Sequence, residues 1–132
     1  MEDRIGQILA GSRTVAVVGL SDSPERPSYD VAKYMQERGF RIIPVNPRIG
    51  EVLGEKSYRS LSEIPEKVDL VDVFRRSEEV PPIAEEAVRV GARFFWMQEG
   101  VVSARAGDIL DAAGIPWIMD RCVKKELRKR GR

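Results

Sequence analysis

The chain has 132 residues, 42% hydrophobic and 33% charged, with a net charge of +1, and these values are typical of a folded protein with one ordinary core. It contains no histidine, which excludes histidine acid–base catalysis and a Ser–His or Cys–His nucleophile. Its single cysteine cannot form an internal disulfide, and a zinc site would lack enough of its preferred ligands. No signal segment and no long apolar run is present, so we expect a cytoplasmic protein without a membrane-spanning helix.

Strand and helix patterns alternate along the chain, and most predicted helices end at a glycine. Apolar, often β-branched runs predict strands at residues 14–18, 40–45, 68–74, 93–97 and 116–119. Helical spacing predicts helices at residues 5–11, 28–38, 81–90 and 103–113, with an irregular connection at residues 48–60. This alternation predicts a single-domain, doubly wound α/β fold: a Rossmann-like, five-stranded and mainly parallel sheet with the first strand central.

Charge is distributed unevenly along the chain. Residues 121–132 carry seven Lys or Arg and one Glu, whereas the preceding part carries 15 basic and 20 acidic side chains. We therefore predict a domain at residues 1–122 and a basic tail at residues 123–132. The tail is interpreted as a solvated helix whose cations complement the helix dipole, and binding of nucleic acid through it is the alternative.

The first predicted strand ends at Gly19 and leads through a polar turn into a helix. This arrangement brings backbone N–H groups and the positive end of a helix dipole to one point, where a phosphate can bind. Ser21 is interpreted as a turn-forming or phosphate-binding residue because the chain offers no histidine base to activate it. Ser28 is interpreted as a helix cap that also contacts phosphate.

Asn46, Pro47 and Arg48 follow the second predicted strand. The glycine-rich G-x-G-x-x-G fingerprint of dinucleotide-binding proteins is missing, since only Gly19 is present. An NAD-binding chain also needs an acidic residue after the second strand. Arg48 instead suits a phosphorylated ribose, which occurs in NADP and in coenzyme A.

Five motifs occur in the order and spacing of a known family: Val15–Ser21, Arg26–Tyr29, Val45–Pro47, Val71–Arg75 and Gln98–Gly100. Over residues 3–122 the chain resembles the stand-alone coenzyme A-binding domain proteins, small relatives of the first domain of the succinyl-coenzyme A synthetase alpha subunit. The resemblance implies a Rossmann-like fold with coenzyme A along the carboxyl edge of the sheet.

The same resemblance assigns each part of coenzyme A to a loop. It implies that Gly19, Leu20 and Ser21 form a phosphate turn and that Ser28 contacts the diphosphate. It implies that Asn46, Pro47 and Arg48 form the site of the 3′-phosphate. It also implies that Val73, Phe74 and Arg75 border the adenine, and that Met97, Gln98 and Glu99 bind the pantetheine arm. The turn after the first strand departs from the glycine-rich turn of the synthetase because it carries Pro24, Arg26 and Pro27.

The resemblance implies a protein that binds coenzyme A or acyl-coenzyme A and has no catalytic centre of its own. The synthetase alpha subunit uses a phosphorylated histidine in a second domain, and this chain contains no histidine. The alternative is an NADP-dependent reductase on a minimal Rossmann domain, which the missing glycines disfavour. We expect no metal, nucleic acid or membrane partner, while the acyl group and homodimer formation stay open.

Cys122 follows the fifth predicted strand and has two interpretations. In the first it is a small apolar residue that fills space in the core. In the second its thiol exchanges with the thiol of the coenzyme, next to the cations Arg121, Lys124 and Lys125.

Overall fold

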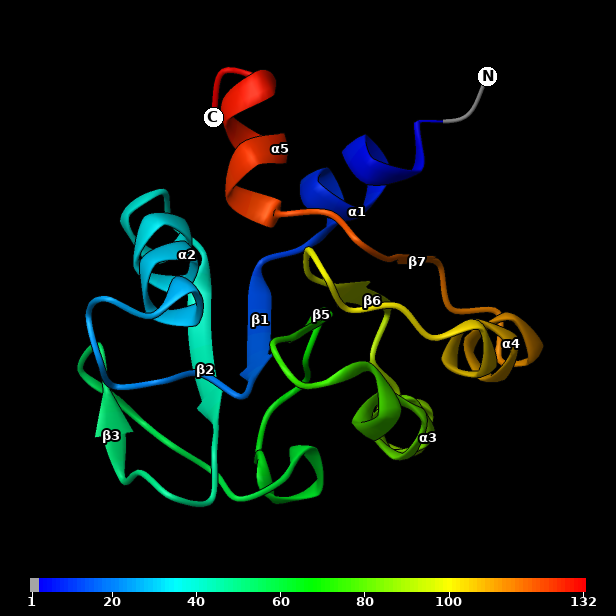
Figure 1. Ribbon diagram of the computed structural model, residues 1–132, viewed down its shortest axis with the longest axis horizontal. Helices are drawn as coiled ribbons and strands as arrows, with labels where there is room; N and C mark the ends of the chain where they lie inside the picture. Colours follow the sequence, from blue (N-terminus) through cyan, green and yellow to red (C-terminus); the bar gives the residue numbers. More distant parts are fainter. Residues whose placement is uncertain (1–2) are drawn as a thin grey trace.

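The computed structural model describes residues 3–132 and shows a three-layer α/β/α arrangement (Figure 1). Five parallel strands form the central sheet in the order β2-β1-β5-β6-β7. Their bounds are β1 Thr14–Val18, β2 Arg41–Val45, β5 Leu70–Val73, β6 Phe94–Met97 and β7 Trp117–Ile118. The predicted Rossmann-like fold is therefore confirmed, although β5 rather than the first strand occupies the middle of the sheet.

Five helices cover the two faces of this sheet. Their bounds are α1 Arg4–Gly11, α2 Pro27–Glu37, α3 Val80–Val90, α4 Ala104–Ala112 and α5 Val123–Lys129. One face packs against α1, α2 and α5, and the other packs against α3 and α4. Smaller elements fill the connections: the hairpin of β3 Glu51–Val52 and β4 Glu55–Lys56, and the short 3₁₀ helices η1 Leu61–Glu63 and η2 Ser77–Glu79.

The apolar runs form strands because both of their faces are buried. Along β6, Phe95 faces the α3/α4 core and Trp96 faces the α1/α2/α5 core, and both side chains are fully buried. Alternation of side chains along a strand gives each face its own apolar layer. Pro44 is accommodated in β2 because this strand lies at the edge of the five-stranded sheet.

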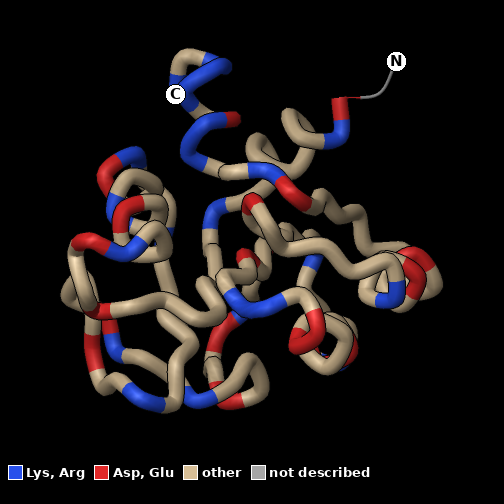
Figure 2. The backbone as a smooth tube through the Cα atoms, in the orientation of Figure 1, with Lys and Arg blue, Asp and Glu red and all other residues tan. Residues whose placement is uncertain are grey.

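Residues 123–129 form α5, which packs as part of the domain rather than as a solvated tail. Val123 and Leu127 have no exposed surface and belong to the same apolar cluster as α1 and α2. Lys and Arg residues recur along this helix and up to the end of the chain (Figure 2). Several form ion pairs with acidic residues elsewhere, such as Lys124 with Asp30 at 2.9 Å. Buried apolar contacts of Val123 and Leu127 thus attach the segment to the domain, and the ion pairs add to them at the surface.

The helix after the first strand begins one residue earlier than the spacing predicts. Pro27 occupies its first position, where the missing N–H costs nothing, and Arg26 is the N-cap residue. Ser28 is therefore inside α2 and is not its cap. Ser103 does cap α4, since its hydroxyl accepts a hydrogen bond from the backbone N–H of Ala106 at 3.1 Å.

Gly19 allows β1 and β5 to end in close contact. Its φ of 89° lies in the left-handed region, and a Cβ at this position would lie 2.5 Å from the carbonyl oxygen of Phe74. Only glycine avoids this overlap, because any side chain would push the two loops apart. None of the helices within residues 3–132 has the length and apolar character needed to cross a bilayer.

We expect Gly19→Ala to lower the free energy of unfolding by roughly 2–5 kcal/mol, through left-handed strain and overpacking. Gly39→Ala is the matched control, because Gly39 has a φ of 95° but no atom within 4 Å of the added Cβ. The control should lose only roughly 1–2 kcal/mol, the strain alone. Urea unfolding of both variants measures the difference, and equal losses would contradict the close contact with Phe74.

Candidate functional site

A pocket of about 830 Å³ opens at the carboxyl ends of the strands. Its walls come from the loops after β1, β2, β5 and β6, together with the first residues of α2 and the residue before α5. The strand order reverses direction between β1 and β5, and ligands of open α/β sheets bind at such a switch point. The pocket therefore lies at the position in the sheet, between β1 and β5, where ligands of this kind of fold bind.

The N-terminus of α2 supplies hydrogen-bond donors to this pocket. Ser28 is 5% exposed, and its Oγ accepts a hydrogen bond from the backbone N–H of Ser21 at 3.0 Å. The hydroxyl proton of Ser28 is then available to a ligand. The backbone N–H groups of Ser28 and Tyr29 donate to no protein group within residues 3–132. Free amides at a helix N-terminus, with the helix dipole behind them, favour an anion.

Four arginines line the pocket and differ in how they are paired. Arg75 forms an ion pair with Glu79 at 2.9 Å, and Arg76 lies 3.6 Å from the same carboxylate. Arg26 and Arg48 form no ion pair with any residue in the range 3–132. Two cations of this pocket are thus left for an anionic ligand.

Asn46 connects the loops that carry these cations. Its Nδ2 donates to the carbonyl oxygen of Leu20 at 3.0 Å, which joins the loop after β2 to the loop after β1. Its Oδ1 accepts from the backbone N–H of Arg48 at 2.9 Å, an Asx turn that fixes the backbone of the arginine. Asn46 therefore has a structural role at the site as well as a place in its wall.

Gln98 links the pocket to a carboxyl group inside the sheet. Its Nε2 donates to Oδ1 of Asp72 at 2.6 Å, and its Oε1 accepts from the backbone N–H of Val123 at 3.4 Å. Asp72 is completely buried, and burial raises its pKa to about 7, although the hydrogen bond from Gln98 acts in the opposite direction. The neutral carboxyl group is consequently favoured over a wide pH range.

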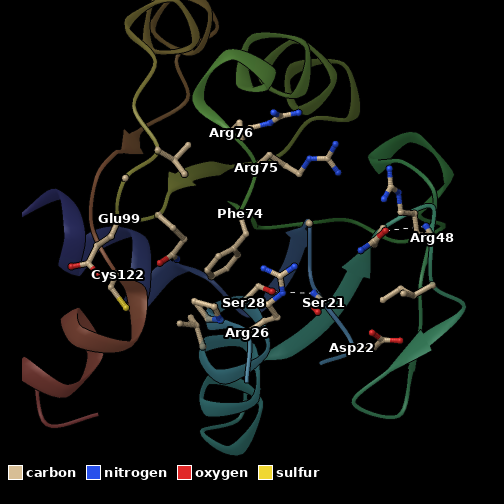
Figure 3. Close-up of a pocket in the computed structure, with 18 residues that line it drawn as sticks. Ser21, Asp22, Arg26, Ser28, Arg48, Phe74, Arg75, Arg76, Glu99 and Cys122 are labelled. Carbon is tan, nitrogen blue, oxygen red and sulfur yellow. Dashed lines mark hydrogen bonds between the residues drawn. The ribbon is translucent and has the colours of Figure 1, made fainter. Parts of the chain in front are cut away.

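The end of the pocket away from Arg48 is formed by Glu99 and Cys122 (Figure 3). Glu99 forms an ion pair with Lys125 of α5 at 2.9 Å, and Cys122 is half-buried beside α5. In the same view Arg26, Ser21 and Ser28 lie together at the start of α2, with Phe74 across the pocket from them. Cationic groups therefore gather around α2 and Arg48, where Asp22 adds a carboxylate to the pocket lining, and the Glu99 carboxylate and the Cys122 thiol mark the other end.

No group of three or more His, Cys, Asp or Glu side chains in the described part of the chain is arranged to hold a metal ion. The arrangement instead suits an elongated ligand with negative charge at one end. Hydrogen bonds from arginine and from backbone amides to phosphate are charge-assisted and strong.

Comparison with known proteins assigns the chain to a family. A family model described as a CoA binding domain matches residues 13–128, most of the chain. The chain belongs to the CoA-binding family. It is 50% identical over 120 residues to the uncharacterized protein YneT of Bacillus subtilis, and the match covers 91% of this chain and 89% of YneT.

Two further relatives show how far the similarity extends. A solved Thermus thermophilus structure, cell-free ID.343, superposes with a TM-score of 0.91 at 35% identity, and 98% of each chain is covered. The alpha subunit of acetate–CoA ligase [ADP-forming] II from Pyrococcus furiosus is 46% identical over 59 residues. That match covers 44% of this chain and 13% of the ligase subunit, so the similarity is to a small part of a longer protein.

Nine of the thirteen residues that sequence motifs assign to the ligand line the pocket of this CoA-binding domain. They are Gly19, Ser21, Ser28, Asn46, Arg48, Phe74, Arg75, Gln98 and Glu99. Four do not line it: Leu20, Val73 and Met97 are fully buried, and Pro47 is exposed beside it. Val73 and Met97 point into the α3/α4 core, because strand alternation turns them away from the face that carries Asp72 and Gln98.

The motifs assigned neither Arg26, which lines the pocket, nor Asp72, which lies behind Gln98, to the ligand site. Arg26 could have been found as the cation directly before a proline at a helix start. Asp72 carried a signal too, since it is a lone carboxylate inside an apolar strand. Cys122, which has two interpretations in the sequence, lines the pocket, and the exchange of its thiol with that of the coenzyme stays a prediction.

We expect Asp72→Asn to change how stability depends on pH. In the unfolded chain the carboxyl group of Asp72 ionises near the ordinary aspartate pKa of 3.8, whereas in the folded protein its pKa is about 7. Because only the unfolded chain releases this proton readily between these two values, rising pH destabilises the wild-type fold across the interval. The stability of the variant relative to wild type should therefore increase by roughly 3 kcal/mol between about pH 4.5 and about pH 8. Urea unfolding across that range measures it.

Asp108→Asn is the control for this prediction. Asp108 is an exposed residue of α4 and forms no ion pair within residues 3–132. Its pH profile should parallel that of the wild type. A parallel profile for Asp72→Asn as well would contradict a proton held by Asp72 in the fold.

Proposed function

We propose that the chain binds coenzyme A or acyl-coenzyme A in this pocket and has no catalytic centre of its own. The observation that carries the proposal is the pair of arginines without carboxylate partners, Arg26 and Arg48, beside the free amides of α2. A ligand with a diphosphate and a separate ribose phosphate matches these two positions. Membership of the CoA-binding family supports the same ligand.

The proposed orientation follows the charges of the pocket. The diphosphate lies at the N-terminus of α2, between Ser28 and Arg26, and the 3′-phosphate lies at Arg48. The adenine packs beside Phe74 and Arg75, since aromatic and guanidinium groups stack on a base. The uncharged pantetheine arm runs toward Gln98 and Glu99, so the thiol end reaches the part of the pocket without free cations.

The proposal of a binding role without catalysis is supported by the residue types at the site. The chain contains no histidine, and Glu99 is already paired with Lys125. The ADP-forming acetate–CoA ligases carry a matching segment that is a small part of their length. We propose that the shared segment contributes coenzyme A binding, and that ligation needs other parts of those proteins.

We expect coenzyme A to raise the melting temperature more than dephospho-coenzyme A, because only the former carries the phosphate that Arg48 pairs with. Arg48→Ala should weaken coenzyme A binding roughly 10-fold and leave dephospho-coenzyme A within about 2-fold, as a lost charge-assisted hydrogen bond predicts. Arg105→Ala, an exposed cation of α4 outside the pocket, is the control and should change neither. Equal weakening of both ligands would refute the role of Arg48.

Arg26→Ala should behave differently from Arg48→Ala. Because Arg26 lies at the proposed diphosphate site, its loss should weaken coenzyme A and dephospho-coenzyme A equally, by roughly 10-fold. Calorimetric titration of both ligands against both variants gives a two-by-two comparison. Selective weakening of coenzyme A by Arg26→Ala would place the 3′-phosphate at Arg26 instead.

An NADP-dependent reductase is the second candidate, and the free Arg48 after β2 is the observation that favours it. NADPH also carries a diphosphate and a ribose phosphate. Titration of NADPH fluorescence separates the two ligands: saturable binding at micromolar levels, tighter than that of coenzyme A, would favour the reductase.

A further inference from the structure

Asp72 has the one buried side-chain oxygen in residues 3–132 that lacks a hydrogen-bond partner, its Oδ2. In the sheet it lies between Val17 of β1 and Trp96 of β6, and both neighbours are fully buried. In such surroundings an ionised carboxylate costs free energy of folding, so the neutral form is favoured. A buried polar atom without a hydrogen-bond partner also calls for an explanation. Nothing in the packing of the core requires a polar side chain at this position.

Gln98 connects this carboxyl group to the ligand pocket. Its side chain is 3% exposed and lines the pocket, while its Nε2 donates to Asp72 at 2.6 Å. Its Oε1 accepts from the backbone N–H of Val123, the first residue of α5. The two bonds fix the orientation of the amide and leave its second N–H free for a ligand. Without an acceptor at Asp72, the amide could turn.

We propose that Asp72 is a positioning residue for the pocket: it holds the Gln98 amide in one orientation and takes up a proton when coenzyme A binds. This inference rests on the proposed function. The diphosphate, placed at the start of α2 in the same pocket that Gln98 lines, brings negative charge that disfavours the ionised form of a completely buried carboxyl group. Burial already raises the pKa of Asp72 to about 7, so both forms exist near neutral pH and binding shifts the balance.

No other ionisable group near Asp72 takes this role. Strands β1 and β6 carry no ionisable side chain. The elements packed on this face and the pocket loops carry further ionisable groups: Arg4 on α1, Tyr29, Asp30, Lys33, Tyr34 and Glu37 on α2, Cys122, Lys124, Lys125, Glu126, Arg128 and Lys129 at α5, and Asp22, Arg26, Arg48, Arg75, Arg76 and Glu99 in the pocket loops. None of them forms a hydrogen bond with Asp72. Three ion pairs join charged groups of α2, α5 and the loop after β6: Lys124 with Asp30, Glu126 with Lys129, and Glu99 with Lys125. Lys33 and Arg128 are exposed to solvent.

Calorimetry in two buffers of different ionisation enthalpy, such as HEPES and Tris near neutral pH, counts the protons taken up with coenzyme A. We expect the wild type to take up roughly 0.3–0.5 proton more than Asp72→Asn, since the variant keeps the shape of the side chain but cannot ionise. Proton exchange by the phosphates of the ligand is common to both proteins and cancels in the difference. Equal uptake by the two proteins would overturn the proposal.

A second pair of variants tests the positioning role. Asp72→Asn retains an oxygen that accepts from Gln98, whereas Asp72→Ala removes it. We expect Asp72→Asn to bind coenzyme A within about 2-fold of the wild type, and Asp72→Ala to bind roughly 3- to 10-fold more weakly, the loss of one hydrogen bond at Gln98. Equal affinities of the two variants would show that Asp72 does not act through Gln98.

A measurement without ligand tests the role of Asp72 separately from the proposed binding of coenzyme A. The side-chain amide signals of Gln98 in NMR spectra should shift with pH around neutrality in the wild type and stay constant in Asp72→Asn. Absence of any heat with coenzyme A would remove the proposed function, and the amide titration would still decide whether Asp72 holds Gln98. If coenzyme A binds but the Gln98 signals do not titrate, the function stands and the role of Asp72 is refuted.

Discussion

The close approach of β1 and β5 at their carboxyl ends is the constraint on which the site depends. The backbone of Gly19 passes so near the carbonyl oxygen of Phe74 that a Cβ would overlap it. This contact turns the chain after β1 sharply into the loop that precedes α2, so that the helix N-terminus faces the edge of the sheet. The hydroxyl of Ser28 then holds that loop through the amide of Ser21. Each later feature of the pocket is built on this turn.

Ion pairs join the C-terminal segment to the rest of the fold, whereas two cations at the pocket have no such partner within residues 3–132. The C-terminal segment has a large excess of cations, and its Lys124, Lys125 and Arg130 are paired with acidic residues from α2, the loop after β6 and the segment before α1. Exposed pairs of this kind contribute little stability one by one. Arg26 and Arg48 line the pocket without a carboxylate partner in residues 3–132, so a ligand can neutralise them.

Asp72 and Gln98 connect the interior of the sheet with the pocket by a hydrogen bond. A carboxyl group in a central strand, a glutamine in the pocket wall and the first amide of α5 form one chain of hydrogen bonds. These hydrogen bonds join the buried carboxyl group to the first residue of a helix that borders the pocket. Its polar members are completely or almost completely buried, so solvent screens their interaction weakly.

The sequence alone determined the five strands, the alternation of helices and the glycine turn after the first strand at Gly19, because apolar periodicity and glycine placement act over short distances. It also placed Ser28, Arg48 and Gln98 at the carboxyl edge, where the order of elements brings loops together. Only the tertiary structure decided which side chains face the pocket and which face the core, as for Val73 and Met97. It also decided that α5 is part of the domain, that Arg26 is left unpaired and that Asp72 meets Gln98. These features depend on contacts between residues far apart in the chain, and local pattern carries no information about such pairs.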